Sequence, residues 1–184
     1  MRIVGGRWRS RALAAPKSQA VRPTADRLRE SLFNVLLHAH GDPVIDARVL
    51  DLFAGTGALG LEALSRGAAF ALFVDDGAQA RALIRANVAA LGAGGSTRVF
   101  RRDATKLGDA HPLAPFSLVF LDPPYGQGLA EKALISARAG GWLAPAALVV
   151  VEEAADAKFK APEGFAEIER RRYDDTEFIF LRAE

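Results

Sequence analysis

Apolar residues follow two patterns along the chain. Short, mostly apolar runs predict buried strands, and they lie at residues 49–53, 70–74, 98–100, 116–121 and 147–151. Between these runs, apolar residues recur three or four positions apart, which predicts amphipathic helices at residues 58–66, 77–91 and 127–138. Strands that alternate with helices are typical of a parallel sheet with helices on both faces.

The two ends of the chain depart from this alternation. Residues 1–13 predict a short hairpin or extended arm, and residues 25–38 predict an amphipathic helix that packs on the body. Near the other end, residues 166–173 and 176–182 alternate between apolar and polar and predict an antiparallel pair. The segment 152–162 is short for a crossover helix, and its pattern predicts no element.

We therefore expect an α/β fold that is Rossmann-like and doubly wound. Its sheet should have seven mostly parallel strands, with one reversed strand in a C-terminal hairpin. Residues 1–47 should form a small basic arm and helix, residues 48–184 the main domain, and the two parts one compact unit. Ligands of such folds bind outside the carboxyl ends of the strands, so residues that follow strands are the first candidates for function.

Composition excludes several kinds of site. The chain has 184 residues, half of them hydrophobic and a quarter charged, which is typical of one globular domain. Cysteine is absent, which excludes disulfides, thiol nucleophiles and cysteine metal sites. The three histidines lack the spacing of zinc ligands, so we expect no metal. No stretch has transmembrane length and the N-terminus has no apolar secretory signal, so we expect a cytoplasmic protein.

Positive charge is concentrated near the N-terminus. Residues 1–30 carry eight basic and two acidic side chains, a net charge of +6, which leaves −4 on the rest because the total is +2. This segregation is typical of nucleic-acid binding, although a solvated arginine-rich face has the same composition. Trp8, between Arg7 and Arg9, could stack on an unpaired base or anchor the arm to the body. The candidates for contact with RNA are Arg7, Trp8, Arg9, Arg11, Arg22 and Arg27.

The first candidate site is VLDLFAGTGALG, residues 49–60. An apolar run ends in Gly55 and Gly57 before a helical pattern, which predicts a strand, a tight turn and a helix. The glycines permit close approach of a ligand, and the start of the helix offers N–H groups to a carboxylate or phosphate. With Gly60 they match G-x-G-x-x-G, so a nicotinamide cofactor is one interpretation. Asp51 favours S-adenosylmethionine, because a strand acid suits its ammonium group better than a pyrophosphate.

Two more acids follow predicted strands. Asp75 comes directly after the run at residues 70–74, where folds of this kind hold the ribose hydroxyls of a nucleotide. Asp103, followed by Ala104, ends the next strand and could accept a hydrogen bond from an adenine amino group. Either acid could instead cap the helix that follows it.

The second candidate site is Asp122-Pro123-Pro124-Tyr125, directly after the run at residues 116–121. The prolines fix the backbone and remove two N–H groups, so the turn presents the Asp122 carboxylate and rigid carbonyls. If Asp122 and the Pro123 carbonyl each accept one hydrogen of a nucleobase amine, the nitrogen lone pair is drawn out of the ring system, while Tyr125 stacks on the base. We expect these four residues to catalyse methyl transfer.

Together these segments resemble a known family. DLFAGTGALGLEALSRGA, NVAALG, RRDA, FLDPPY, RWRSRAL and RPTADRLRESLFN are similar to the RsmD-type 16S ribosomal RNA guanine-N2 methyltransferases. The resemblance implies a class I fold, S-adenosylmethionine as cofactor, and methylation of the N2 amine of guanine 966 in 16S rRNA of the assembled or assembling 30S subunit. We also expect a monomer. The residues expected to bind the cofactor are Asp51, Phe53, Gly55, Thr56, Gly57, Asp75, Asp103 and Ala104. Many relatives have glutamate in place of Asp75, which shortens the reach of that side chain.

Three other functions fit parts of the sequence. An Asp-Pro-Pro-Tyr turn holds an amine without specifying the base, so an adenine-N6 methyltransferase acting on DNA or RNA is an alternative. A nicotinamide oxidoreductase would use the glycine pattern but leaves the turn and the basic arm without a role. An RNA-binding module that no longer catalyses would keep the arm, and the complete set of cofactor motifs argues against it.

Overall fold

The structure, a computed structural model, describes residues 1–19 and 23–184. Its helices are α1 (Pro23–Ala39), α2 (Ala58–Ser65), α3 (Ala78–Leu91) and α4 (Leu129–Ala139), with short 3-10 turns η1 (Lys17–Gln19), η2 (Gly94–Ser96) and η3 (Ala104–Lys106). Its strands are β1 (Arg48–Leu52), β2 (Phe70–Val74), β3 (Thr97–Phe100), β4 (Phe116–Leu121), β5 (Leu143–Ala154), β6 (Phe165–Tyr173) and β7 (Thr176–Ala183).

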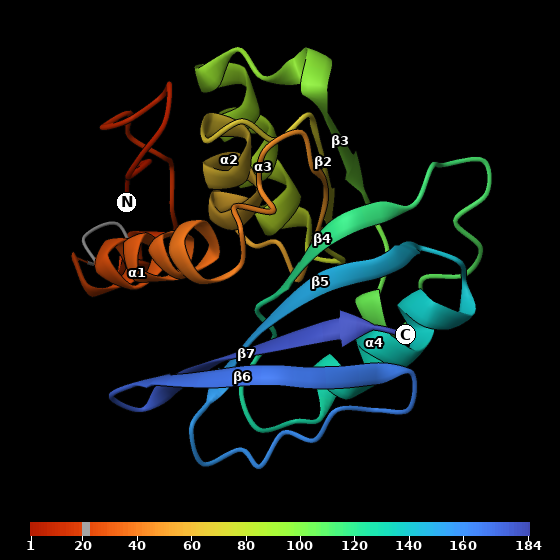
Figure 1. Cartoon of the computed structure of the whole chain (residues 1–184). Coiled ribbons are helices and arrows are strands. Elements are labelled where there is room, and N and C mark those ends of the chain that lie inside the picture. The colour runs from red at the N-terminus through yellow and green to blue at the C-terminus, as the bar shows by residue number, and fades with distance from the viewer. Residues whose placement is uncertain (20–22) are drawn as a thin grey trace.

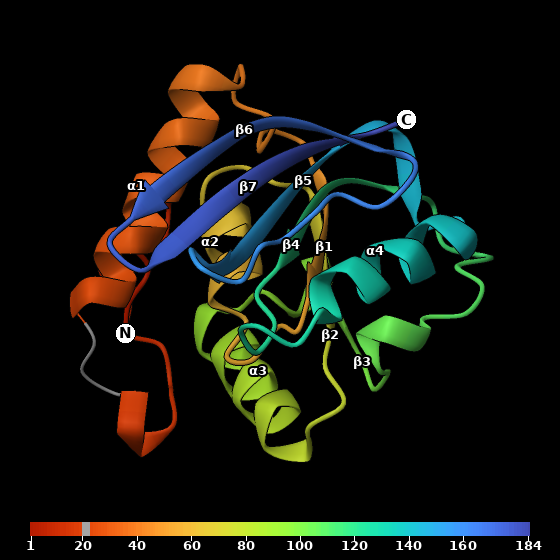
Figure 2. The same cartoon turned by 90° about the horizontal axis from the view of Figure 1, so that it is seen from below.

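The seven strands form one sheet in the order β3-β2-β1-β4-β5-β7-β6 (Figures 1 and 2). Strands β1 to β5 pair in parallel, and β7 runs antiparallel between β5 and β6. This topology confirms the predicted doubly wound sheet with one reversed strand. The strand order changes direction between β1 and β4, and ligands of such sheets bind at the carboxyl ends near that point.

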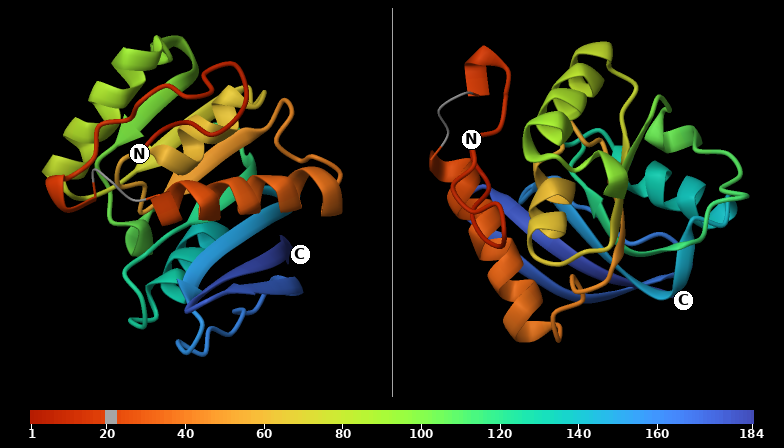
Figure 3. Two further views of the ribbon diagram at one scale, coloured as in Figure 1. Left: turned by 90° about the vertical axis from the view of Figure 1, so that its left-hand side faces the viewer. Right: turned by 90° about the horizontal axis from the view of Figure 1, so that it is seen from above.

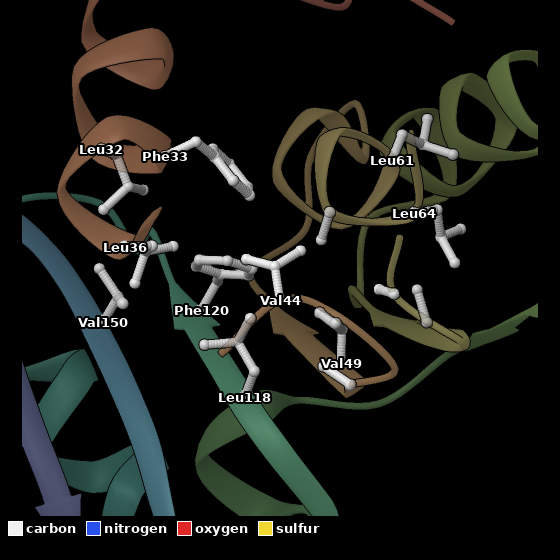
Figure 4. Close-up of a cluster of buried hydrophobic side chains, with 14 of the residues drawn as sticks. Leu32, Phe33, Leu36, Val44, Val49, Leu61, Leu64, Leu118, Phe120 and Val150 are labelled. Atoms are coloured by element: carbon white, nitrogen blue, oxygen red, sulfur yellow. The ribbon is translucent and has the colours of Figure 1, made fainter. Parts of the chain in front are cut away.

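Helices cover both faces of the sheet. Successive side chains of a strand point to opposite faces, so a strand buried on both faces is apolar throughout. On one face α1, α2 and α3 pack on the strands, with Phe33 of α1 beside Phe120 of β4 and Leu36 of α1 near Val150 of β5 (Figure 4). The two phenylalanine ring centroids are 5.7 Å apart. On the other face α4 and η3 cover a second core that contains Leu121 and the fully buried Trp142.

Strand β5 is longer than predicted. The apolar run predicts residues 147–151, but the strand begins at Leu143 and continues through Glu152 and Glu153 to Ala154. Pairing with β7 continues through both glutamates, since Glu152 lies opposite Phe178 and Glu153 opposite Glu177. The first three residues of the unassigned segment 152–162 therefore belong to the sheet.

The N-terminal arm is a hairpin that lies over α2 and α3 (Figure 3). Its two sides are joined by an antiparallel bridge between Arg2 and Ala12 and by hydrogen bonds such as Ile3 N–H to the Arg11 carbonyl, 2.9 Å. The amides of Val4 and Gly5 donate to the Glu62 carboxylate, each at 2.9 Å. The arm is therefore tied to the helix that follows the glycine loop.

Candidate active site

A cavity of about 720 Å³ opens at the carboxyl ends of the parallel strands. Its walls come from the loop after β1, the turn after β4, the ends of β5 and β7 that face this edge, the first two turns of α1, and Met1 of the arm. Segments from both ends of the chain therefore meet at one mouth. Of the residues predicted for cofactor binding or catalysis, those that line the cavity are Asp51, Phe53, Gly55, Thr56, Asp122 and Tyr125.

The loop after β1 has the backbone that its glycines predict. Phe53, Gly55 and Gly57 have φ angles of 55°, 60° and 81°, in the left-handed region that glycine adopts without cost. A Cβ at Gly55 would meet no atom within 4 Å, so the loop leaves open space there for a ligand. Gly60 has a different role, because its Cβ would lie 2.5 Å from the Phe73 ring. The third glycine of the motif thus lets α2 pack closely on β2.

Asp51 is buried beneath this loop, with 1% of its surface exposed. One carboxylate oxygen accepts a hydrogen bond from the Gly60 amide at 3.0 Å. Burial raises the pKa of Asp51 to about 8; the bond from Gly60 lowers it and the charge of Asp75 adds to the increase. A buried acid that accepts a backbone hydrogen bond, beside an open glycine loop, fits a ligand that brings its own positive charge.

Asp75 and Asp103 follow their strands as predicted, but neither lines the cavity. Both Asp75 oxygens accept backbone bonds, one from Gly55 at 3.0 Å and one from Gly77 at 2.9 Å. Asp103 caps η3, which begins at Ala104, by accepting hydrogen bonds from the amide and the hydroxyl of Thr105. These bonds lower the pKa of Asp103. Contact of either acid with a nucleoside stays a prediction.

The Asp-Pro-Pro-Tyr turn follows β4, which lies between β1 and β5. The Asp122 side chain is exposed at the cavity. Partial loss of hydration beside the surrounding protein, and then the charges of Glu152, Asp51 and Glu153, raise its pKa well above the usual range. The Tyr125 hydroxyl donates to Glu152 at 2.8 Å, and the Gly126 amide donates to Glu153 at 2.9 Å. The end of β5 therefore holds the turn in place.

The residues that hold the glycine loop and the Asp-Pro-Pro-Tyr turn in place were not predicted from the sequence. Glu152 and Glu153 directly follow an apolar run, which is the same signal that identified Asp75, and could have been found by it. Asn87 of α3 donates to the Thr56 carbonyl at 2.9 Å and to the Ala14 carbonyl at 3.0 Å, so it links the glycine loop to the arm. Asn87 begins the segment NVAALG, which belongs to the family resemblance, but the pattern of apolar and polar residues does not predict these contacts.

The described arginines among those predicted to contact RNA do not line the cavity. Arg7, Arg9, Arg11 and Arg27 are exposed, and Arg22 lies outside the residues that the structure describes. Trp8 is half-buried against the core, its amide donates to the Ser65 hydroxyl at 3.0 Å, and the Arg7 guanidinium lies 4.2 Å from the centre of its ring. These contacts anchor the arm; stacking of Trp8 on a base stays a prediction.

Among residues 1–19 and 23–184, no cluster of three histidines or acids is placed to hold a metal ion. Across the same described ranges, no helix combines the length and the apolar character needed to cross a membrane.

The doubly wound sheet, the open glycine loop over a buried acid and the Asp-Pro-Pro-Tyr turn at the same mouth define a class I methyltransferase that uses S-adenosylmethionine. The family model described as Conserved hypothetical protein 95 matches residues 1–182, and the chain belongs to this family. The nicotinamide interpretation of the glycine pattern is therefore set aside.

Individual relatives agree with this assignment. The chain is 46% identical over 153 residues to Ribosomal RNA small subunit methyltransferase D of Escherichia coli, covering 83% of this chain and 74% of the relative. It is 36% identical over 168 residues to the Haemophilus influenzae protein of the same name, covering 90% and 84%. The solved structure of yhhF from Escherichia coli superposes with a TM-score of 0.83 at 36% identity, covering 100% of this chain and 98% of that one. The resemblance to RsmD-type methyltransferases is confirmed.

Proposed function

We propose that this protein transfers a methyl group from S-adenosylmethionine to the exocyclic N2 amine of a guanine in 16S ribosomal RNA, position 966 in family naming. The observation that carries the proposal is the position of Asp122, which lines the same cavity as Gly55 and Asp51 of the cofactor loop. An acceptor for an amine and a loop for the cofactor thus face one space. Relatives named ribosomal RNA small subunit methyltransferases support RNA as the substrate.

The cofactor fits the part of the cavity beside β1. Asp51 would hold the ammonium, the open face of Gly55 and the start of α2 would receive the carboxylate, and Phe53, Thr56 and Gly57 complete the loop. Asp75, Asp103 and Ala104 would receive the nucleoside at the ends of β2 and β3. When bound, S-adenosylmethionine supplies a methyl group activated by its sulfonium charge.

The chain's own task is to orient the base. The amine of a nucleobase is a weak nucleophile because its lone pair is delocalised into the ring. Asp122 and the carbonyl of Pro123 would accept its two hydrogens, Pro124 keeps the turn rigid, and Tyr125 would stack on the base. The carboxylate form of Asp122 accepts a hydrogen bond more strongly than the protonated acid does, so we expect turnover to increase with pH through the titration of this group, whose pKa is raised.

The basic arm would contact the RNA around the target base. Met1, the first residue of the hairpin, lines the cavity, whereas Arg7 and Arg9 are exposed near the tip of the hairpin, which is hydrogen-bonded to Ser65 at the opposite end of α2. Arg11 donates to the Ala90 carbonyl at 2.6 Å, and Arg27 is exposed on α1. From this surface beside the site, the arginines would neutralise phosphates on either side of the target base while the base enters the cavity. We propose that the assembled or assembling 30S subunit is the partner and that the enzyme acts as a monomer in the cytoplasm.

One experiment tests the proposed function directly. Small subunits from cells that lack this protein are incubated with the purified enzyme and S-adenosylmethionine carrying a labelled methyl group, and the modified nucleoside is identified by mass analysis. We expect N2-methylguanosine at a single site. N6-methyladenosine would instead establish the adenine alternative, and the absence of any labelled nucleoside would contradict the proposal.

Cofactor binding is expected to release a proton. In the free protein Asp51, with its pKa raised to about 8, is protonated at pH 6–7. The α-ammonium of the cofactor, whose pKa is about 8, is already charged in this range. Pairing favours the carboxylate, so binding should release roughly one proton, and affinity should increase up to tenfold per pH unit toward pH 8. Calorimetry in buffers of different ionisation enthalpy measures this release.

The matched variants are Asp51→Asn and, as control, Asp76→Asn, which alters an exposed acid outside the cavity. The first should bind roughly 10-fold or more weakly without proton release, since one charge-assisted bond is removed. The second should behave as wild type. Binding by wild type that releases no proton between pH 6 and 7 would show that Asp51 does not pair with the ammonium.

The arm is expected to contribute to the salt dependence of RNA binding. Replacing Arg7 and Arg9 together by alanine should weaken binding and reduce the slope of log affinity against log salt by about 1 for each phosphate that is no longer neutralised. Lys132→Ala serves as control, since this exposed lysine lies on α4, on the opposite face of the sheet. A slope equal to that of wild type would exclude these arginines from the interface.

A further inference from the structure

Glu152 is the side chain beside Asp122 at the end of the sheet. Leu121 of β4 lies opposite Val151 of β5 in parallel register, so the next residues of the two strands, Asp122 and Glu152, continue side by side. Adjacent strands are about 4.8 Å apart, and residues at equivalent positions point to the same face. Both side chains line the cavity, and the charge of Glu152 is among the causes that raise the pKa of Asp122.

The hydrogen bonds of Glu152 leave one of its oxygens available. Oε1 accepts the Tyr125 hydroxyl at 2.8 Å. Oε2 accepts no hydrogen bond from the residues that the structure describes. Tyr125 is itself expected to stack on the base, so its bond fixes the Glu152 carboxylate next to the edge of that base. The cavity thus presents two acceptors in a row, Asp122 and Glu152.

Guanine carries two neighbouring donors that match this row. Its exocyclic N2 amine and its N1–H lie side by side on the Watson–Crick edge, whereas adenine has an unprotonated N1 acceptor next to its N6 amine. A carboxylate accepts from N1–H but repels the lone pair of adenine N1. Sites built to hydrogen-bond a substrate N–H reject analogues that lack it much more strongly than apolar pockets reject a missing methylene.

Building on the proposed function, we propose that Glu152 accepts a hydrogen bond from N1–H of the target guanine and thereby selects guanine over adenine. Asp122 holds the reacting amine, and Glu152 identifies the base that carries it. Glu152 is therefore a specificity-determining residue at the substrate end of the cavity. This assigns the discrimination between bases to the end of β5 rather than to the Asp-Pro-Pro-Tyr turn.

The test uses 2-aminopurine, which keeps the 2-amino group but has no hydrogen on N1. Small subunits are reconstituted with 16S RNA that carries either guanine or 2-aminopurine at the target position, and the initial rate of methyl transfer to each is measured. In Glu152→Gln, the Tyr125 hydroxyl should hold the amide oxygen and turn the amide NH₂ toward N1. The glutamine NH₂ would then donate a hydrogen bond to N1 of 2-aminopurine. In guanine the same NH₂ would face N1–H, which is also a donor, so no hydrogen bond would form.

We expect the preference of wild type for guanine over 2-aminopurine to decrease about 10- to 100-fold in E152Q, which corresponds to one hydrogen bond to a charged group. Because each preference is a ratio measured on one enzyme, it is independent of the fraction of active protein. Glu163→Gln, at an exposed acid in the loop before β6, should keep the wild-type ratio.

A ratio in E152Q equal to that of wild type would overturn the inference and leave methyl transfer to guanine intact. A variant inactive on both bases would also overturn it, since selection through N1 requires transfer to 2-aminopurine to persist. Failure of wild type to methylate the guanine subunits would instead contradict the proposed function itself.

Discussion

Replacing Asp122 by alanine is expected to reduce turnover by about 10²- to 10³-fold, the loss found when one preorganised hydrogen-bonding group at a reacting atom is removed. The amine would lose the acceptor that orients its lone pair, while the cofactor loop keeps Asp51 and Gly55. Single-turnover methyl transfer to small subunits measures the chemical step, and calorimetry with S-adenosylmethionine measures binding. We expect the affinity for S-adenosylmethionine to change little.

The same substitution should not destabilise the fold. Within the described chain the Asp122 side chain accepts no hydrogen bond, and the neighbouring charges of Glu152 and Asp51 oppose its ionisation. Alanine removes this repulsion, so the free energy of unfolding should stay the same or increase, as is common when a functional residue is removed. Near wild-type turnover in the variant would contradict the catalytic role of Asp122. Loss of cofactor affinity would instead show that Asp122 contacts the cofactor.

Replacing Glu62 by alanine is expected to lower the free energy of unfolding by about 3–5 kcal/mol, as for other buried ion pairs that lose one partner. Glu62 of α2 is fully buried and accepts from the Val4 and Gly5 amides at 2.9 Å. It also pairs with Arg29 of α1 at 3.1 Å and with Arg66 at 2.9 Å. One carboxylate thus joins the arm to two helices.

The expected decrease in the free energy of unfolding is large because the positive charge of Arg29 would stay buried without its main partner. Arg29 is 5% exposed, and among the described residues its hydrogen-bonding partners without Glu62 are Asp26 and the Arg2 carbonyl. Urea unfolding measures the decrease, with Glu30→Ala, an exposed acid on α1, as the control. A decrease below about 1 kcal/mol, typical of an exposed pair, would mean that the network contributes little.

Arg27 and Arg29 are two positions apart near the start of α1, but their environments differ. The structure leaves Arg27 exposed and buries Arg29 in the Glu62 network, with part of its surface at the cavity wall. Two positions along a helix are about 200° apart, so neighbours of the same type can have different environments.

The sequence by itself determined the strands and the two motifs. The apolar runs at 70–74 and 116–121 coincide with β2 and β4, because a strand covered on both faces is apolar at nearly every position; the exposed Ser117 of β4 is the exception. The glycines at 55 and 57 and the two prolines after Asp122 act through their own backbones, so their effect is readable from residue type alone. Local chemistry was sufficient for these features.

Only the tertiary structure decided which acids share a site. Asp122 and Glu152 are 30 positions apart in the chain and become neighbours through the register of β4 and β5, which no local pattern encodes. Asp75 and Asp103 both follow strands, but the fold brings Asp75 to the amide of Gly55, 20 positions earlier in the chain, at 3.0 Å. Glu62 lies in a helix where a charged residue predicts exposure, and it is buried because the arm folds over it. Contacts between distant segments set the environment of a charge, and that environment sets its role.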